Sequence, residues 1–174
     1  MQSIVKEINE WFLPKREHFE SFAQNDVLVE PWLKTEMLTL LELLKCGLVI
    51  DDFESDCMVA ADKGKRKVDF RVVIEGEAHV CGIRAACTSM VRTQRPLSHY
   101  FSGHKESLLT DLHRLNEIRA DKDHRCLVVF AYPRPSRQHW RAAMESLPVN
   151  LANWRCVTDV GRRNEHVFIG LCIG

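Results

Sequence analysis

The chain has 174 residues, of which 45% are hydrophobic and 28% are charged, as is ordinary for a soluble globular protein. Its 24 basic side chains (Lys and Arg) balance its 24 acidic ones, so no overall field draws it toward a polyanion or a membrane surface. No apolar run approaches the roughly 18 residues of a membrane-spanning helix, and no basic-then-apolar leader begins the chain, which predicts a cytoplasmic protein with one domain over residues 1–174.

Residues 1–30 are expected to form a helical extension in front of a main domain that we place at residues 31–174. Apolar side chains recur at helical spacing from Ile4 to Phe12. Pro14 then starts or kinks a second short helix that carries Phe19 and Phe22.

A longer helix is predicted over Trp32–Cys46, because Pro31 suits the first turn of a helix and the apolar residues that follow share one face. That face consists of Leu33, Met37, Leu40, Leu41 and Leu44. Glu36 lies at the border of this apolar stripe, early in the helix. Residues 57–61 then form a short apolar run that could be a strand, and residues 63–67 form a basic turn.

Residues 67–86 carry the clearest strand signal, because two runs rich in β-branched residues flank a glycine. A two-residue loop that begins with Gly76 is typical of a type II′ hairpin turn. Such a turn sets Glu75 opposite Ala78. Counting back from it sets Asp69 opposite Arg84, and it sets Arg71 opposite Gly82.

Alternation along the two strands of this hairpin predicts one apolar face and one charged face. The apolar face would hold Val68, Phe70, Val72, Ile74, His79, Cys81, Ile83 and Ala85. The charged face would hold Asp69, Arg71, Glu75 and Arg84. A cluster of charges on one side of a hairpin is the best functional clue in the chain.

After the hairpin, predicted helices and strands alternate. An amphipathic helix covers residues 97–119, with an interruption near Gly103. An unbroken apolar run at residues 126–132 indicates a strand covered on both faces. Ser136 is a candidate N-cap for a helix that ends at Leu147, and two short strands follow in residues 149–157 and 166–173. The fold class is therefore α/β (α+β), with a mixed central sheet of four to five strands that helices flank on both faces.

From about Pro31 to Tyr132, this order of elements resembles the restriction-endonuclease-like superfamily, also called the PD-(D/E)xK nucleases. Its members have a helix, a three-stranded antiparallel meander, a second helix and a further strand beside the first. The resemblance implies a catalytic Asp at the start of the second strand, Glu-x-Lys on the third and, in many members, a Glu from the first helix. It places Asp69 at the Asp position, Glu36 as the helix Glu, and Gly82-Ile83-Arg84 at Glu-x-Lys.

Two positions of that motif depart from the superfamily's pattern. The nuclease chemistry needs two or more carboxylates to hold Mg²⁺ against the phosphate, and Gly82 supplies none. Arg84 keeps the charge of the Lys but lacks its tunable pKa. Arginines at positions 71 and 84 would also repel a metal cation. Asp69 and Arg84 equally fit a cross-strand ion pair with no role beyond stability, worth some tenths of a kcal/mol.

The leading interpretation is a nuclease-like domain whose catalytic site has decayed, which uses no cofactor and binds nucleic acid or a protein. One alternative is an active Mg²⁺-dependent nuclease that uses Asp69 and Glu36 with a further carboxylate from residues 51–56. Another is an interaction protein, or scaffold, that binds neither metal nor nucleic acid. The seven cysteines include no C-x-x-C pair, so no structural metal site is predicted, and no membrane partner is expected.

Basic side chains near the hairpin are the candidates for phosphate contacts, which would carry no base specificity. They lie before the hairpin, on its charged face and after it: Lys65, Arg66, Lys67, Arg71, Arg92 and Arg95. If the fold resembles the nucleases, the first and last of these groups flank the mouth of a site at Asp69.

Overall fold

The computed structural model describes residues 1–174 except 93–94, 104–106, 121–123 and 159–165. Three helices come first, and their bounds are α1 (Val5–Phe12), α2 (Arg16–Gln24) and α3 (Glu30–Cys46). The predicted stripe of α3 is confirmed, since all five of its apolar residues are buried. However, α3 begins at Glu30, two residues before the predicted start, because Pro31 occupies the first turn.

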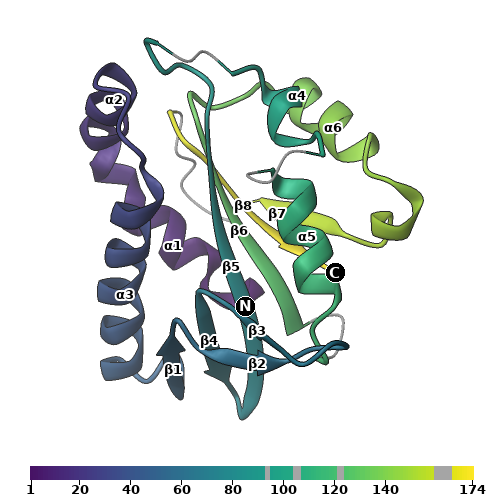
Figure 1. The fold of residues 1–174 in the computed structure, drawn as a ribbon. Helices are drawn as coiled ribbons and strands as arrows, with labels where there is room; N and C mark the ends of the chain where they lie inside the picture. The colour runs from purple at the N-terminus through teal and green to yellow at the C-terminus, as the bar shows by residue number, and fades with distance from the viewer. Residues whose placement is uncertain (93–94, 104–106, 121–123, 159–165) are drawn as a thin grey trace.

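The remaining elements form a mixed sheet with helices inserted between its strands (Figure 1). The strands are β1 (Asp52–Ser55), β2 (Met58–Ala60), β3 (Lys65–Lys67), β4 (Phe70–Ile74), β5 (Glu77–Cys87), β6 (Arg125–Tyr132), β7 (Arg155–Thr158) and β8 (Phe168–Ile173). The helices are α4 (Leu97–Tyr100), α5 (Leu108–Asn116) and α6 (Arg137–Glu145), so the helix predicted over residues 97–119 is two helices. Ser136 caps α6 as predicted, because its hydroxyl accepts a hydrogen bond from the His139 amide.

The main sheet has six strands in the order β1-β4-β5-β6-β8-β7, and β2 and β3 form a separate two-stranded ribbon. The sheet is mixed as predicted, but it has more than the four to five strands expected. β1, β4 and β5 make an antiparallel meander, and β6 pairs with β5 in parallel. β6 therefore lies beside the third strand of the meander, where the expectation had placed it beside the first.

The hairpin between β4 and β5 has a different turn and register from the prediction. Its loop is Glu75-Gly76, both with positive φ (53° and 79°), which is a type I′ turn, where the prediction was type II′. Ile74 therefore faces Glu77, and Arg71 faces Val80. The predicted pairing of Asp69 with Arg84 is wrong by two residues. A shift of two keeps every side chain on its face of the sheet.

Helices cover both faces of the sheet, and each face has its own core cluster (Figure 1). The α1–α3 side contains the predicted apolar face of the hairpin, including Phe70, Val72, Ile74, Cys81 and Ile83. Val68 is the exception: it precedes β4 and packs in the other cluster, on the side of α4–α6. Within the described part of the chain, no helix is long and apolar enough to span a bilayer.

The β2–β3 ribbon crosses the sheet in front of β5 and reaches α5 (Figure 1). At its root, next to β4, the two arms of the ribbon are joined by the Val68 amide, which donates to Cys57 O at 3.0 Å. Its tip is fixed beside the end of α5, where the Asp62 amide donates to Glu117 O at 2.8 Å. The basic turn predicted at residues 63–67 is partly strand, because β3 begins at Lys65.

Candidate functional site

One half of β5 has an unpaired edge, and this edge is the floor of the candidate site. β4 pairs with β5 only as far as Cys81, because β4 begins at Phe70, whereas β6 pairs with β5 as far as Cys87. Two carboxylates take the place of the missing strand. The Ile83 amide donates to Asp69 Oδ2 at 2.7 Å, and the Ala85 amide donates to Glu30 Oε1 at 3.1 Å.

A cleft of about 230 Å³ opens above this edge. Glu30 and Lys34 of α3 form one wall, and Asp111 and Arg114 of α5 form the other. Gly82 and Arg84 lie on its floor, and Arg66 and Lys67 of β3 line one end. The cleft therefore collects charged side chains from four elements that are distant in the sequence.

Arg84 joins the two walls. Its Nε donates to Asp111 Oδ2 at 2.5 Å, and its Nη1 donates to Glu30 Oε1 at 2.9 Å. Burial alone would lower the pKa of Arg84. The hydrogen bond and charge of Asp111, and to a smaller extent those of Glu30, outweigh burial and raise that pKa. Burial also raises the pKa of Glu30, and the Arg84 charge opposes that effect. The guanidinium is thus fixed between two carboxylates as a built-in cation.

Lys34 neutralises the third carboxylate of the cleft. Its ammonium forms an ion pair with Asp69 Oδ1, while Asp69 Oδ2 holds the Ile83 amide. Burial would lower the pKa of Lys34, but the hydrogen bond and charge of Asp69 outweigh it and raise that pKa. Every carboxylate that lines the cleft therefore has a cationic partner supplied by the chain itself.

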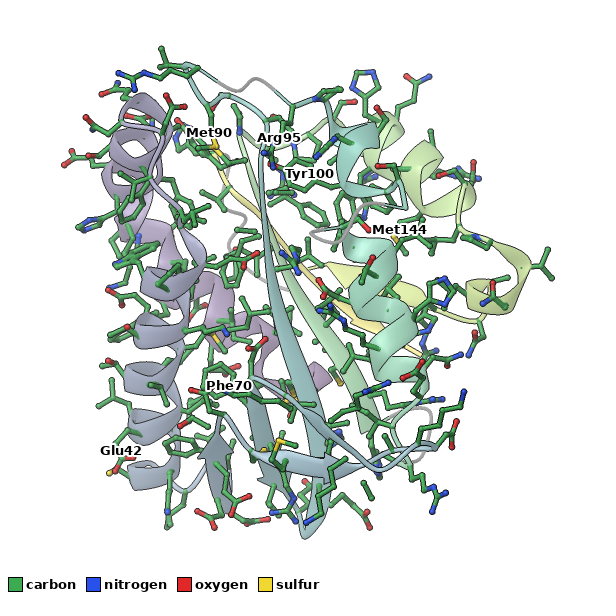
Figure 2. All side chains as sticks on the ribbon, viewed as in Figure 1. Glu42, Phe70, Met90, Arg95, Tyr100 and Met144 are labelled. Atoms are coloured by element: carbon green, nitrogen blue, oxygen red, sulfur yellow. The ribbon has the colours of Figure 1, made fainter. Side chains whose placement is uncertain are left out.

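A second cleft of about 170 Å³ adjoins the first, since Glu30 and Arg84 line both. It follows β5 toward its carboxyl end, where Met90, Arg95 and Tyr100 lie close together (Figure 2). We call the two clefts together the β5 groove. Its described lining has six basic side chains, Lys34, Arg66, Lys67, Arg84, Arg95 and Arg114, and three acidic ones, Glu30, Asp69 and Asp111. Basic side chains therefore outnumber acidic ones in this lining although the chain is neutral, and two of them, Arg66 and Lys67, pair with Glu117 and Asp56.

The structure brings together Asp69, Arg84, Arg66, Lys67 and Arg95 from the residues that the sequence singled out. Both basic groups predicted to flank the site contribute to the groove, Arg66 and Lys67 at one end and Arg95 at the other.

The other predicted residues do not line the groove. Glu36 accepts from Trp11 Nε1 at 2.9 Å and pairs with Lys15 at 2.9 Å, away from Asp69. Arg71 lies 4.0 Å from Glu54 on β1. Arg92 is 87% exposed and approaches Asp26, and Lys65 is an exposed residue of β3.

Sequence reasoning missed four charged residues of the groove: Glu30, Lys34, Asp111 and Arg114. Glu30 stands directly before Pro31, so the preference of Pro for the first helical turn was a signal that could have placed it in α3. Lys34 then lies four residues later, on the same face of that helix. No local pattern marks Asp111 or Arg114, because their positions depend on how α5 packs on the sheet.

No group of three or more His, Cys, Asp or Glu side chains in the described residues is arranged to hold a metal ion. The acidic run at residues 51–56, considered as a source of a further metal ligand, is used elsewhere. Asp51 accepts from the Gly76 amide at 2.7 Å, Asp52 pairs with Lys45 at 2.7 Å, and Asp56 pairs with Lys67 at 2.8 Å.

A larger cavity of about 730 Å³ lies between α4 and α6, away from these charges. Its described lining is mostly Pro, Ala, Ser and Leu, with Arg134 and His139 as its basic residues and no carboxylate. Size alone would favour this cavity as a site. We favour the β5 groove, because its polar groups converge from several elements and hold one another in place.

Comparison of the chain with protein-family models, with curated proteins and with solved structures found no match in any of the three.

Proposed function

We propose that this protein is a restriction-endonuclease-like domain that does not cleave phosphodiesters and that binds nucleic-acid phosphates in the β5 groove without a metal ion. The observation that carries the proposal is the charge pairing inside the groove. Lys34 pairs with Asp69, and Arg84 pairs with Glu30 and Asp111. In the proposed reading, these two cations take the place that Mg²⁺ would have in a nuclease of this type.

The order of elements supports the fold part of the proposal. Along the chain come a helix (α3), an antiparallel meander (β1, β4, β5) interrupted by the β2–β3 ribbon, two helices (α4, α5) and a further strand (β6), although β6 pairs with the third strand of the meander where the first had been expected. Asp69 directly precedes the second strand of the meander, and Gly82-Ile83-Arg84 lies on the third. In this proposal the acidic residue from the first helix would be Glu30, which lines the cleft, where Glu36 had been expected. This support is an analogy at the level of the fold, and the function rests on the site.

The lost carboxylate at Gly82 supports the absence of cleavage. A Cβ atom at this position would meet Leu127 Cδ1 at 3.0 Å and Asp69 Oδ2 at 3.8 Å. A side chain at this position would therefore require Leu127 to shift by a few tenths of an ångström, while Asp69 stands at ordinary contact distance. A metal ion at the three remaining carboxylates would compete with Lys34 and Arg84 for them.

Binding to phosphates is supported by the excess of basic side chains in the groove. Arg66, Lys67 and Arg114 are 43–62% exposed, so their side chains can turn toward a ligand. For electrostatic binding of this kind, the logarithm of the binding constant falls linearly with the logarithm of the salt concentration. The slope is about −0.7 for each phosphate contacted on a single strand.

Two assays test the proposal. Supercoiled plasmid is incubated with the protein in Mg²⁺ or Mn²⁺, and binding of labelled single-stranded and duplex oligonucleotides is measured in EDTA as salt is varied. We expect intact plasmid, and binding that persists in EDTA and weakens with salt. Cleavage that Asp69→Ala abolishes would contradict the proposal and favour the Mg²⁺-dependent nuclease. Absence of binding at low salt would favour the scaffold that binds no nucleic acid.

A further inference from the structure

The cavity of about 730 Å³ between α4 and α6 has no part in the proposed function. It lies at the end of the sheet where the parallel strands β5 and β6 both end, since α4 follows β5 along the chain and α6 follows β6 (Figure 1). Ligands of α/β proteins commonly bind in a crevice outside the carboxyl ends of parallel strands. The volume is also within the roughly 300–1,000 Å³ of cavities that enclose small molecules. The cavity therefore has the place and the size of a ligand site.

The cavity is open because α6 presents small side chains to it. Trp140 anchors α6 in the core, where its ring contacts the rings of Phe101 and Phe168. Beside this anchor, the face of α6 that lines the cavity carries Ala142, Ala143 and Ser146. Such short side chains leave the space between the two helices unfilled.

Part of the cavity wall is stiff and apolar. Pro96, Pro133 and Pro135 line it together with Leu97 and Phe101. A proline ring fixes its own backbone φ angle and carries no N–H donor. This part of the wall is therefore preformed and suits the apolar body of a ligand.

The charges of the cavity have one sign and lie on one side. Among the residues described for its lining, Arg134 is the one permanent cation, His139 is the other basic side chain, and no carboxylate is present. Arg134 stands shortly before α6, and His139 lies in the first turn of that helix. This side of the cavity attracts an anion, and one permanent cation matches a ligand with one negative charge.

The chain holds Arg134 in place for such a contact. Its Nη1 donates to Val167 O at 3.2 Å, and its guanidinium carbon lies 5.7 Å from the centre of the Phe168 ring. A guanidinium has five N–H donors in a fixed fork, so it can keep Val167 O and also donate to both oxygens of a carboxylate. Arg134 is half-buried, so its charge is only partly screened by water.

We propose that this cavity binds a small-molecule carboxylate with an apolar body, whose carboxylate contacts Arg134 and whose apolar part lies against Leu97 and Phe101. A carboxylate is favoured over a phosphate dianion, which would need more cations than the described lining offers. The site is separate from the β5 groove, because their described linings share no residue. The inference therefore stands whether or not the groove binds nucleic acid.

The first test compares octanoate, octanol and octylammonium, which have the same chain and differ in charge. Each is titrated into the protein below its micelle concentration, and binding is followed by calorimetry and by the shift of the melting temperature. We expect octanoate to bind about tenfold more tightly than octanol, because hydrogen bonds to charged groups are the stronger ones, and octylammonium to bind most weakly. From hexanoate to octanoate, affinity should rise about fourfold for each added methylene that enters the cavity.

A pair of matched variants connects binding to the cavity. Ala142→Phe fills the cavity from an exposed position of α6, so it should weaken octanoate binding about tenfold, as expected when two methylenes are displaced. Gln138→Phe puts the same residue at an exposed position of the same helix outside the described lining, so it should leave binding unchanged. Thermal melting checks that each variant is folded.

A second pair connects the charge preference to Arg134. Arg134→Gln should weaken octanoate binding about tenfold and leave octanol binding unchanged. Octanol is the internal control, because a collapsed cavity would lose both ligands. Arg137→Gln removes an exposed cation of α6 outside the described lining and should change neither affinity.

The possible outcomes separate the parts of the inference. Equal binding of octanoate and octylammonium would overturn the assignment of a carboxylate, as would unchanged octanoate binding by a folded Arg134→Gln variant. Unchanged binding by Ala142→Phe, or an affinity that does not rise with chain length, would overturn the placement in this cavity. Absence of binding by all three probes would overturn the whole inference and leave the proposed function standing.

Discussion

Replacing Arg84 with Met removes the guanidinium that joins α3 to α5 across the groove. Met has a flexible apolar side chain that can follow the aliphatic part of Arg84. The change leaves Glu30 and Asp111 facing each other without their cation. The fold should then lose stability, because two partly desolvated carboxylates have no compensating charge.

The magnitude follows from the burial of the three groups. Removing one partner of a buried ion pair typically costs about 3–5 kcal/mol. Arg84 and Asp111 are 13% exposed and Glu30 is 32% exposed, so water reaches part of the site. We therefore expect the lower end, about 3 kcal/mol.

The free energy of unfolding is measured by urea denaturation at constant pH and salt. Arg114→Met is the matched control: Arg114 also pairs with Asp111, but at 3.8 Å and with 61% exposure, so its loss should cost under about 0.5 kcal/mol. A triple variant, Arg84→Met with Glu30→Gln and Asp111→Asn, removes all three charges and should recover most of the stability. A loss below about 1 kcal/mol for Arg84→Met would refute the reasoning.

The folding stability of the Arg84→Met variant should depend on pH in a defined direction. The pKa of Glu30 is already raised by burial, and without the Arg84 charge it rises further. A carboxyl group whose pKa is higher in the folded than in the unfolded state binds more protons when folded, so stability falls as pH rises between those two values. The cost of Arg84→Met should therefore be smaller near pH 5 than near pH 7.5. A cost that grows on acidification would contradict this.

Three further predictions follow from single positions or from the groove as a whole. Gly82→Asp restores an acidic residue to the degenerate motif, yet plasmid assays should detect no cleavage and urea denaturation should show a loss of stability, because its Cβ would meet Leu127 Cδ1 at 3.0 Å. Gly76→Ala should cost about 1–2 kcal/mol of unfolding free energy, since Gly76 has φ +79° in the hairpin turn; an unchanged value would mean that the turn adopts another type. Oligonucleotide affinity should fall steeply with salt for the native chain and less steeply for Lys67→Ala, and identical slopes would remove Lys67 from the phosphate contacts.

Much of the fold could be predicted from local patterns. The buried stripe of α3 follows from the helical spacing of its apolar residues, and the Ser136 cap follows from a local hydrogen bond. The buried strand β6 follows from its unbroken apolar run. The register of the β4–β5 hairpin could not be predicted in this way, because either Glu75-Gly76 or Gly76-Glu77 could form a two-residue loop. Glu75 adopts positive φ, which is uncommon for a residue with a side chain, so the sequence favoured the wrong turn.

The candidate site was predicted only in outline. Asp69 and Arg84 do line one cleft, as their shared face of the hairpin suggested. Their partners come from α3 and α5, which reach β5 through packing that no local pattern encodes. Both helices have amphipathic sequences, but periodicity fixes which face is buried and leaves open which polar residue meets which strand. For this reason the expected pair of Asp69 with Arg84 is replaced by two others: Asp69 pairs with Lys34, and Arg84 pairs with Asp111.

The central claim is that Lys34 and Arg84 replace a metal ion, so that the groove binds phosphates and does not cleave them. The most direct measurement follows one phosphorylated, internally labelled oligonucleotide with the native chain, in EDTA and then in Mg²⁺ or Mn²⁺. The account predicts the same affinity in both conditions and an intact oligonucleotide after prolonged incubation. Binding that requires the divalent cation, or cleavage that Asp69→Ala abolishes, would contradict it.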